Sequence, residues 1–497
     1  MATIIPRWEW RTFGRRFGIA EKHFAELTPA GIQESDELYF LGGTGENVKI
    51  RDDLLDIKVL REVDAAGLER WEPVMKKGFP LPKADVVSAI ESLHLTAPEL
   101  VRETYTREQF LDELISPQAV VRPVQIHKRR VRYTIGGCTS EVTDVRAEGK
   151  TTRTIAIESE DASAVVSAVA SAGLSCYLNT SYPRGLRALL DGAPERYAVI
   201  DVGTNSTKFH VGERTDDGTW RRLVDRAEMT RLGEGLDERG EIGSEAAERT
   251  AVAIADMVEE ANRNGVLAIA AVGTAGLRIA RNSASVVAAI RSRTGVSIEV
   301  ISGEEEGRLA YLAVKEGLGL PEGSLVVFDT GGGSTQFTFG QEARVDERFS
   351  LDVGAVRYTE RFGLAGVVSS DVLRAALAAI AADLSRIDGR PPPDALVAMG
   401  GAVTNIAAVK HSLTTYDPDV VQATLLDRAE IDRQIELYRS RDAAQRRAIV
   451  GLQPKRAEVI LAGACIVRTV MEKLGKDELR VSDRGLRHGL LIERFGV

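Results

Sequence analysis

The sequence has few cysteines, no long apolar run and no excess of basic residues. Its three cysteines, Cys138, Cys176 and Cys465, are far apart and form neither a disulfide framework nor a zinc-ligand pattern, which favours a reducing compartment. Met1-Ala2-Thr3 is followed by charge rather than by the apolar core of a signal peptide, and no run of 18 or more apolar residues occurs. We therefore expect a cytoplasmic protein that is neither secreted nor membrane-spanning.

The charge balance excludes a generally basic nucleic-acid binder, because the formal net charge is -9. An anionic ligand would have to be met by local basic clusters. The 497 residues suggest two to four domains of roughly 150 residues each, and 44% apolar with 28% charged residues is typical of a soluble globular protein. The assembly state, with a homodimer as one option, is left open by the sequence.

Two related glycine-rich stretches organise the rest of the chain. In residues 325–335 an apolar run delivers Asp329, and the candidate phosphate-binding residues that follow are Gly331, Gly332, Gly333, Ser334 and Thr335. Residues 200–209 repeat the pattern with Asp201, followed by Gly203, Thr204, Asn205 and Ser206. A single stretch of this kind is typical of a tight β-hairpin. The repeat favours a duplicated fold with phosphate bound between its halves.

The residue types in both stretches suit a phosphate ligand. Glycines can take positive φ and let backbone N–H groups approach an anion, and hydroxyls add further donors. Asp201 and Asp329 could hold a hydrated Mg²⁺ that bridges phosphate oxygens. We therefore expect Mg²⁺ as the cofactor.

Residues 1–192 differ from the rest because strand-like segments alternate apolar with charged residues, as in 38–41, 48–51, 55–60, 131–135 and 151–158. On an open sheet this alternation indicates a solvated face. Inside a closed barrel it gives a tunnel lined with cations and a few carboxylates, suited to polyphosphate. The candidate polyphosphate-binding cations are Arg51, Lys58, Lys128, Arg130 and Arg132, and Lys49 shares their spacing.

The sequence predicts a helix over 162–172 and then a turn-rich boundary at the end of the N-terminal region. This boundary runs from Tyr182-Pro183-Arg184-Gly185 to Asp191-Gly192-Ala193-Pro194. Downstream, helices and strands alternate, with helices expected over 244–262, 283–293, 304–315 and 371–387 and strands over 267–272, 296–301 and 395–398. This α/β pattern predicts mixed sheets. We expect domains at 1–192, 195–330 and 331–497.

Three further stretches are candidates for the same site. Residues 272–282 end a strand in a Gly/Thr turn and place Arg278 and Asn282 at i and i+4 on one predicted helical face, although a lone helical arginine is more often in a surface salt bridge. In residues 301–309 Ser302 can cap a helix whose first turn holds three glutamates, one of which could be a general base. Residues 397–405 predict a strand, a glycine turn and a helix N-terminus, another anion or nucleotide site.

The first 170 residues or so resemble CYTH-like triphosphate-tunnel domains. The resemblance lies in Glu9-Trp10-Arg11, in 56–60 with Arg51 before it, in 128–132 with Glu141, and in 154–158. It implies a strand-rich barrel that binds or cleaves triphosphate and polyphosphate. The family's opening motif of alternating glutamates ending in lysine is reduced here to Glu9 between Trp8 and Arg11, which favours anion binding over metal-dependent cleavage.

From about Tyr197 to the C-terminus, five motifs resemble the exopolyphosphatase and guanosine pentaphosphate phosphatase (Ppx/GppA) family. They are residues 201–206, 277–282, 301–309, 329–334 and 482–489, in the family's order. The resemblance implies duplicated actin/hexokinase-like (ribonuclease H-like) domains that hydrolyse terminal phosphate from inorganic polyphosphate or guanosine pentaphosphate with Mg²⁺. It also implies that Glu306 is the catalytic glutamate, and Gly307 stands where the family usually has alanine.

Three functions compete. In a phosphoanhydride hydrolase, Asp201 and Asp329 organise Mg²⁺, both loops hold phosphates, Arg278 offsets developing charge and Glu306 activates water. A kinase or ATPase of the same superfamily would need an acceptor site and an adenine pocket near Gly400 and Gly401. A non-catalytic polyphosphate or alarmone sensor would use both regions as binding modules. The retained Asp201, Glu306 and Asp329 favour the hydrolase.

Overall fold

The structure is a computed structural model that describes residues 5–496, apart from 43–45, 65–66, 237–239, 321 and 343. Contacts divide the chain into two compact units. Unit 1 contains residues Met1–Val300 and Glu493–Val497, and unit 2 contains Ile301–Ile492. Unit 1 holds a barrel and a five-stranded sheet, whereas unit 2 holds a six-stranded sheet.

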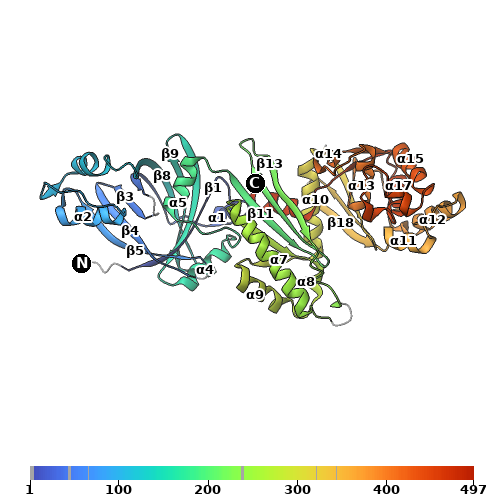
Figure 1. Cartoon of the computed structure of the whole chain (residues 1–497), viewed down its shortest axis with the longest axis horizontal. Helices are drawn as coiled ribbons and strands as arrows, with labels where there is room; N and C mark the ends of the chain where they lie inside the picture. Colours follow the sequence, from blue (N-terminus) through green and yellow to red (C-terminus); the bar gives the residue numbers. More distant parts are fainter. Residues whose placement is uncertain are drawn as a thin grey trace. The chain divides into compact units, whose positions relative to one another are not determined.

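Eight antiparallel strands close the barrel in the order β1-β10-β9-β8-β2-β3-β4-β5, with β5 pairing back onto β1 (Figure 1). Their bounds are β1 Arg7–Gly14, β2 Gly31–Leu41, β3 Asn47–Arg51, β4 Leu54–Val63, β5 Glu69–Gly78, β8 Arg122–Ile135, β9 Cys138–Ala147 and β10 Lys150–Ser159. The five predicted strand segments lie within β2, β3, β4, β8 and β10, so the barrel prediction is confirmed.

The alternation along these strands separates an apolar outer face from a charged interior. Phe40, Ile50 and Ile57 belong to a core that includes Val86 and Ile90 of helix α2 (Lys83–Ser92). Helix α4 (Ala162–Ser171) packs on β1 and β10. Because neighbouring side chains on a strand point to opposite faces, the charged residues between the apolar ones face inward.

Glu37 is the hub of the barrel interior and is completely buried. Its carboxylate lies 2.9 Å from Lys128 Nζ, 3.4 Å from Lys49 Nζ and 3.6 Å from a guanidinium nitrogen of Arg130. Burial alone would raise the pKa of Glu37, but the surrounding cations, Lys49 and Lys128 first, hold it well below its usual range. The interior is therefore an ion-pair network rather than a purely cationic lining.

The predicted turn-rich boundary is wrong, because Tyr182–Asp191 forms helix α5. Ser181 caps this helix by accepting from Arg184 N, and Pro183 is tolerated because it lies in the first turn. Gly192 ends the helix in the left-handed conformation. The proline and glycine that suggested a turn are thus helix start and stop signals.

Helix α5 contributes side chains to the interior of the barrel. The ring of Tyr182 stacks on Tyr39 with a centroid distance of 5.0 Å, and Lys128 Nζ lies 3.8 Å from the Tyr182 centroid. A Cβ on Gly185 would collide with the ring of Phe13. The segment that we expected to be a boundary therefore packs inside the N-terminal domain.

The two sheets downstream have the same strand arrangement over five strands, and the second sheet has β20 as an additional edge strand. In unit 1 the order is β13-β12-β11-β14-β15, and in unit 2 it is β18-β17-β16-β19-β21-β20. In both, the central strand pairs antiparallel on one side and parallel on the other. The strand bounds are β11 Glu195–Val202, β12 Thr207–Arg214, β13 Trp220–Glu228, β14 Ala268–Gly273, β15 Ile298–Val300, β16 Ser324–Thr330, β17 Thr335–Gln341, β18 Arg344–Leu351, β19 Ala395–Met399, β20 Leu425–Asp427 and β21 Glu478–Val481. The predicted duplication with mixed sheets is confirmed.

The helices agree with the predicted α/β alternation. Unit 1 has α7 Ser244–Arg263, α8 Ala275–Ile279 and α9 Ser283–Thr294. In unit 2 the longer helices are α10 Gly303–Leu318, α11 Ala355–Phe362, α12 Ser370–Asp383, α13 Gly401–Lys410, α15 Arg428–Arg439 and α17 Ile460–Lys473, and helix α18, Leu486–Phe495, runs from unit 2 into the C-terminal residues of unit 1. Helix α17 is buried over most of its length and joins the core of the six-stranded sheet.

The compact units differ from the three expected domains. The barrel and the first α/β domain share unit 1, where the Tyr197 ring stacks on Phe495 at 4.6 Å and Tyr177 packs edge-on against Phe495. Unit 2 begins at Ile301 rather than after residue 330, because β16 hydrogen bonds to β17 and β19 of the second sheet.

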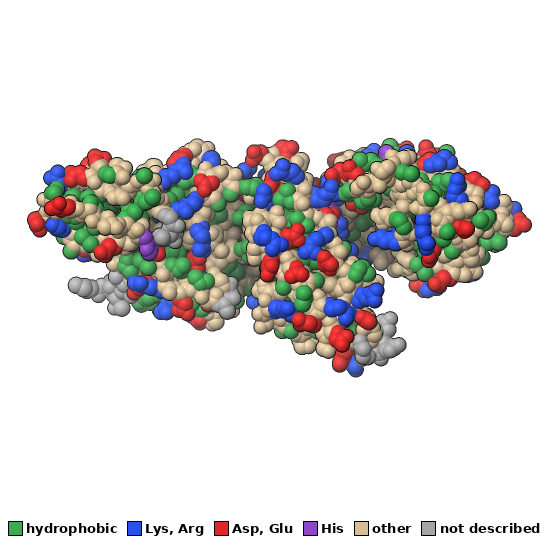
Figure 2. Space-filling model, in the orientation of Figure 1, with side chains coloured by type: hydrophobic (Ala, Val, Ile, Leu, Met, Phe, Trp, Pro, Cys, Tyr) green, Lys and Arg blue, Asp and Glu red, His purple; other side chains and the backbone are tan. Residues whose placement is uncertain are grey.

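Basic and acidic side chains are interspersed over the face of the molecule drawn in Figure 2. This mixture agrees with the expectation that basic clusters are local. Among the residues that the structure describes, no helix is both long enough and apolar enough to cross a bilayer.

We predict that Glu37→Gln lowers the free energy of unfolding by about 3–5 kcal/mol, because it leaves several buried cations without their counter-charge. Urea denaturation of the full chain measures this loss. The matched control is Glu34→Gln, which makes the same change on the exposed side of the same strand and should have little effect. Equal stability of the two variants would contradict the role of Glu37 as a hub.

Candidate active site

The two glycine loops close with the same hydrogen bond. Between β11 and β12, Gly203 N donates to Ser206 O at 3.1 Å. Between β16 and β17, Gly331 N donates to Ser334 O at 2.9 Å. The sequence repeat is therefore a structural repeat, with Asp201 and Asp329 next to last in their strands.

The next residue after each loop is also used in the same way. Thr207 Oγ1 lies 3.1 Å from Thr230 Oγ1, just beyond β13. Thr335 Oγ1 donates to Val353 O at 2.6 Å, just beyond β18. Each loop is thus fixed to the segment that follows β13 or β18. The Thr335 hydroxyl is engaged in that contact.

The glycines do not have the positive φ that we expected, at Gly203 or at Gly331, Gly332 and Gly333. Close approach explains two of these glycines. A Cβ on Gly203 would lie 2.8 Å from Ser206 O, and one on Gly332 would lie 3.0 Å from Val356 Cγ2. The absence of a side chain is therefore needed for tight packing at Gly203 and Gly332 rather than for backbone handedness.

The first loop is enclosed by two neighbouring segments of unit 1. Thr204 O accepts from Gly233 N at 2.9 Å, and a Cβ on Gly276 would lie 3.1 Å from Thr204 Oγ1. Asp201 is 3% exposed and accepts from Lys208 Nζ at 3.1 Å. One carboxylate oxygen of Asp201 is therefore already neutralised by a cation.

Helix α8 brings Arg278 to the same part of unit 1, on the exposed side of a helix whose first turn contacts Thr204. The predicted helical pairing with Asn282 is wrong, because α8 ends at Ile279 and Ala280 is extended. Asn282 instead bonds both N–H and C=O of Ile242 at 2.9 Å. Asn282 therefore holds the backbone of Ile242 in place and is not a candidate for ligand binding.

In unit 2 the carboxylate of Asp329 lies against Gly400. A Cβ on Gly400 would collide with Asp329 Oδ1, and Gly400 has φ 91°. Strand β19, this glycine and helix α13 form the strand, turn and helix N-terminus predicted for residues 397–405. Only glycine fits here, because any other residue would displace the carboxylate and strain the backbone.

Helix α10 carries the acidic first turn. Ser302 Oγ accepts from Glu305 N at 3.1 Å, which confirms the predicted cap. Arg308 donates twice to Glu305, at 2.8 and 2.6 Å. Glu306 is partly exposed and follows directly. Capping and ion pairing thus account for Glu305, whereas Glu306 is placed where water can reach it.

The C-terminal motif positions this helix, a role that the sequence did not reveal. A Cβ on Gly489 would collide with Leu309 O, so α18 crosses α10 at one turn from Glu306. Ser482 Oγ donates to Arg484 O at 2.9 Å, and Tyr416 Oη donates to Asp483 at 2.6 Å. Within the motif, Gly489 therefore packs on the backbone of α10, whereas Ser482 and Asp483 are held by hydrogen bonds outside that helix.

In the barrel, two of the candidate cations are deeply engaged. Lys128 is 1% exposed, and its Nζ donates to Glu37 at 2.9 Å and to Tyr39 Oη at 2.8 Å. Arg130 Nε lies 2.9 Å from a carboxylate oxygen of Glu141. The sequence reading missed Glu37 and Tyr39, although both follow the period-two alternation of β2.

The other three cations are less buried and more loosely paired. Arg51 lies 3.6 Å from Asp56, Lys58 lies 3.9 Å from Glu9, and the exposed Arg132 donates to Gln33 at 2.8 Å. Burial alone would raise the pKa of Glu9, but Arg11 and Lys58 outweigh it and lower this pKa to about 2. Arg51, Lys58 and Arg132 are therefore the cations most available to an added anion.

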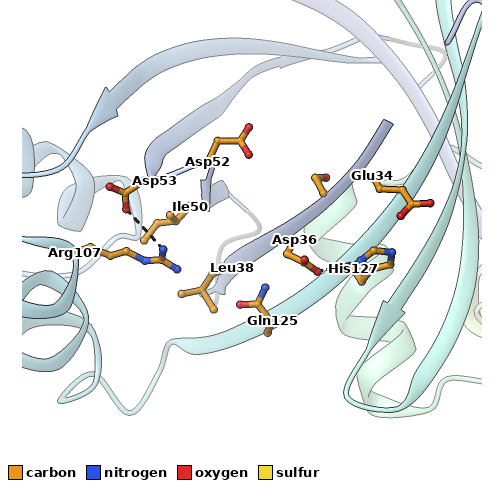
Figure 3. A pocket seen from close by; sticks show the side chains of 10 residues that line it. Glu34, Asp36, Leu38, Ile50, Asp52, Asp53, Arg107, Gln125 and His127 are labelled. Atoms are coloured by element: carbon orange, nitrogen blue, oxygen red, sulfur yellow. Dashed lines mark hydrogen bonds and ion pairs between the residues drawn. The ribbon is translucent and has the colours of Figure 1, made fainter. Parts of the chain in front are cut away.

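A cavity of about 500 Å³ on the outer side of the barrel is acidic and suits no polyanion (Figure 3). Glu34, Asp36, Asp52 and Asp53 line it. Its basic side chains already have acidic neighbours, because Arg107 lies 3.7 Å from Asp53 and the His127 ring lies 3.0 Å from Asp36.

The family model, the similar sequences and the similar structures all point to one protein family. A family model described as the Ppx/GppA phosphatase family matches residues 211–496. Exopolyphosphatase 2 of Mycobacterium tuberculosis is 29% identical over 326 residues, which cover 61% of this chain and 99% of that protein. Exopolyphosphatase 1 of Mycobacterium bovis is 29% identical over 305 residues, 60% of this chain and 88% of that protein. The crystal structure of the Aquifex aeolicus Ppx/GppA phosphatase aligns with a TM-score of 0.58 at 31% identity, covering 61% of this chain and 99% of that one.

Proposed function

Because this chain belongs to the Ppx/GppA phosphatase family, we propose that it releases terminal orthophosphate from inorganic polyphosphate. The family makes it a phosphoanhydride hydrolase, and its duplicated α/β halves have the actin/hexokinase-like fold that the resemblance implied. The observation that carries the proposal is the pair of glycine loops, each closed by the same hydrogen bond and preceded by an aspartate. Polyphosphate is chosen because the mycobacterial relatives are exopolyphosphatases.

Glu306 acts as the general base. Its carboxylate takes a proton from water, the water oxygen attacks the terminal phosphorus, and the bridging P–O bond breaks so that the shortened chain leaves as an anion. The resemblance assigns this role to Glu306, and its partial exposure supports access of water to the carboxylate. Arg278 offsets negative charge that develops on the phosphoryl oxygens.

The loops hold phosphate through the backbone and side-chain donors of residues 204–206 and 332–334, because Gly203 N, Gly331 N and Thr335 Oγ1 already donate to other groups. Carboxylates beside such donors fit Mg²⁺, which prefers oxygen ligands and keeps several waters. Asp329 fits this role, and Asp201 fits it with the oxygen that Lys208 leaves unbonded. Bound Mg²⁺ would supply positive charge against the phosphate oxygens.

The barrel holds a second part of the same polymer. Its closed, eight-stranded form agrees with the CYTH-like resemblance. Arg51, Lys58 and Arg132 are only loosely paired with neighbouring side chains, so they can bind phosphate in their place. Holding one polymer at two sites raises the local concentration of chain ends. The attraction is local and salt-sensitive because the net charge is -9.

A phosphate-release assay tests the function directly. Long polyphosphate, short polyphosphate, guanosine pentaphosphate and ATP are compared in parallel with Mg²⁺ present. Release from polyphosphate but not from ATP is expected. Phosphate transfer to an acceptor would favour a kinase, and binding without release would favour a sensor.

We predict that Glu306→Gln lowers the turnover number by about 10²- to 10⁴-fold and leaves polyphosphate binding largely intact, because the amide keeps the shape but cannot take a proton. Phosphate release and the dissociation constant are both measured. Glu304→Gln is the matched control in the same helical turn and should retain turnover. If Glu306→Gln stays within about threefold of the parent, another group is the base.

We predict that Asp329→Ala abolishes Mg²⁺-dependent release even at high Mg²⁺, whereas Asn205→Ala lowers it less, because Asn205 supplies one donor among many. A titration of activity against Mg²⁺ measures both variants. Recovery of Asp329→Ala to near the parental rate at excess Mg²⁺ would place the metal elsewhere.

We predict that Lys58→Ala combined with Arg132→Ala raises the KM for long polyphosphate and leaves the KM for short chains unchanged, since only long chains can engage both sites. The effect should shrink as salt increases. The control is Arg129→Ala combined with Lys77→Ala, which removes two cations from the outer wall of the same barrel. Equal KM values for both double variants on long chains at low salt would reject the tethering role.

A further inference from the structure

Arg348 lies across the backbone of helix α10 directly after Glu306. A Cβ on Gly307 would collide with Cδ and Nε of Arg348 and would lie 2.9 Å from its Cζ. Both residues belong to unit 2, in which α10 packs on β18. The guanidinium therefore occupies the space that an ordinary side chain at position 307 would fill.

The alternation along β18 sends Arg348 to the helix side of the sheet. The next residue, Phe349, stacks on Phe337 and Phe339 in the aromatic part of the opposite core. Because adjacent strand residues point to opposite faces, Arg348 faces α10. Its direction is set by the strand, so its place beside Glu306 does not depend on a flexible loop.

Arg348 differs from its charged neighbours on β18 in having no partner among the residues that the structure describes. Glu347 is bonded by Arg386 at 3.1 Å and by Arg390 at 2.7 Å, and Asp346 pairs with Arg344 at 2.8 Å. Within the described parts of the chain, the Arg348 side chain has no hydrogen bond or ion pair, although it is only partly exposed. A half-buried guanidinium without a counter-charge is costly, and a bound anion would remove that cost.

We propose that Arg348 is a substrate-binding residue that donates to a phosphoryl oxygen of polyphosphate beside the water-activating Glu306, and that Gly307 is needed to admit it. This inference rests on the proposed hydrolase function. A planar guanidinium can bond two oxygens of a phosphate at once, which suits a chain of phosphoryl groups. Glycine in a helix is otherwise less favourable than alanine, so its presence here has a physical reason in the space that Arg348 occupies.

The first experiment measures binding and turnover separately. Arg348→Ala should raise the KM for polyphosphate about 10-fold or more, and Arg348→Lys should give an intermediate value because the ammonium keeps the charge but not the fork. In the Glu306→Gln background, adding Arg348→Ala should weaken the dissociation constant for polyphosphate by a similar factor. Arg344→Ala, on the same strand but paired with Asp346, is the control and should change neither value.

The second experiment tests the link between the two positions. Gly307→Ala should raise the KM because the new methyl group displaces Arg348. Adding Gly307→Ala to Arg348→Ala should cause no further rise and should increase the melting temperature, because the space is then empty and alanine favours the helix. Equal effects of Gly307→Ala in both backgrounds would show that it does not act through Arg348.

The outcomes separate this inference from the function on which it rests. A KM within twofold of the parent for Arg348→Ala, in an enzyme that does release phosphate, would overturn the role of Arg348 alone. No release by the parent, together with Arg348-dependent binding in the Glu306→Gln protein, would overturn the hydrolase proposal and keep the binding residue. Loss of melting temperature in both Arg348 variants without a change in polyphosphate binding would make Arg348 a packing residue.

Discussion

One local hydrogen bond, which the N–H of the first glycine of each loop donates to the carbonyl oxygen three residues later, sets the geometry on which the phosphatase halves depend. It closes the turn between two antiparallel strands, so the aspartate just before it is held at the strand end. The turn leaves little room: a Cβ on Gly203 would meet Ser206 O, and one on Gly354 would collide with the backbone of Gly332. Small residues are therefore required in the loops and also in the segments that enclose them.

The barrel is organised by a different constraint, the need to neutralise charge inside a closed surface. Glu37 gathers Lys128, Lys49 and Arg130, and Tyr182 from α5 covers the deepest cation. Such a network fixes the interior side chains, because removing any member leaves a buried charge without compensation. Its deep part is consequently structural. The more loosely paired Arg51, Lys58 and Arg132 are the part that a polyanion can compete for.

Glycine has the same purpose at several points of unit 2. Gly400 admits the carboxylate of Asp329, Gly489 lets α18 approach α10, and Gly307 leaves room for Arg348. Two of these positions adjoin the proposed base or the proposed metal ligand directly. Because glycine has no side chain, it allows charged groups such as Asp329 and Arg348 to lie directly against the backbone.

The sequence by itself determined the duplication, the strand-rich N-terminal region and the elements that carry Asp201, Arg278, Glu306 and Asp329, because period-two alternation, apolar runs and capping residues are local signals. It misread Tyr182–Asp191 as a boundary, since Pro and Gly mark helix ends as well as turns, and it placed Asn282 on a helix that ends three residues earlier. Only the tertiary structure decided which barrel cations are engaged, because Glu37 and Lys128 are 91 residues apart and their pairing depends on strand register. The same holds for Arg348, whose neighbour Gly307 looks like an ordinary helical position until β18 packs against α10. Local patterns specify elements, whereas the partners of a charged side chain are fixed by contacts between segments far apart in the chain.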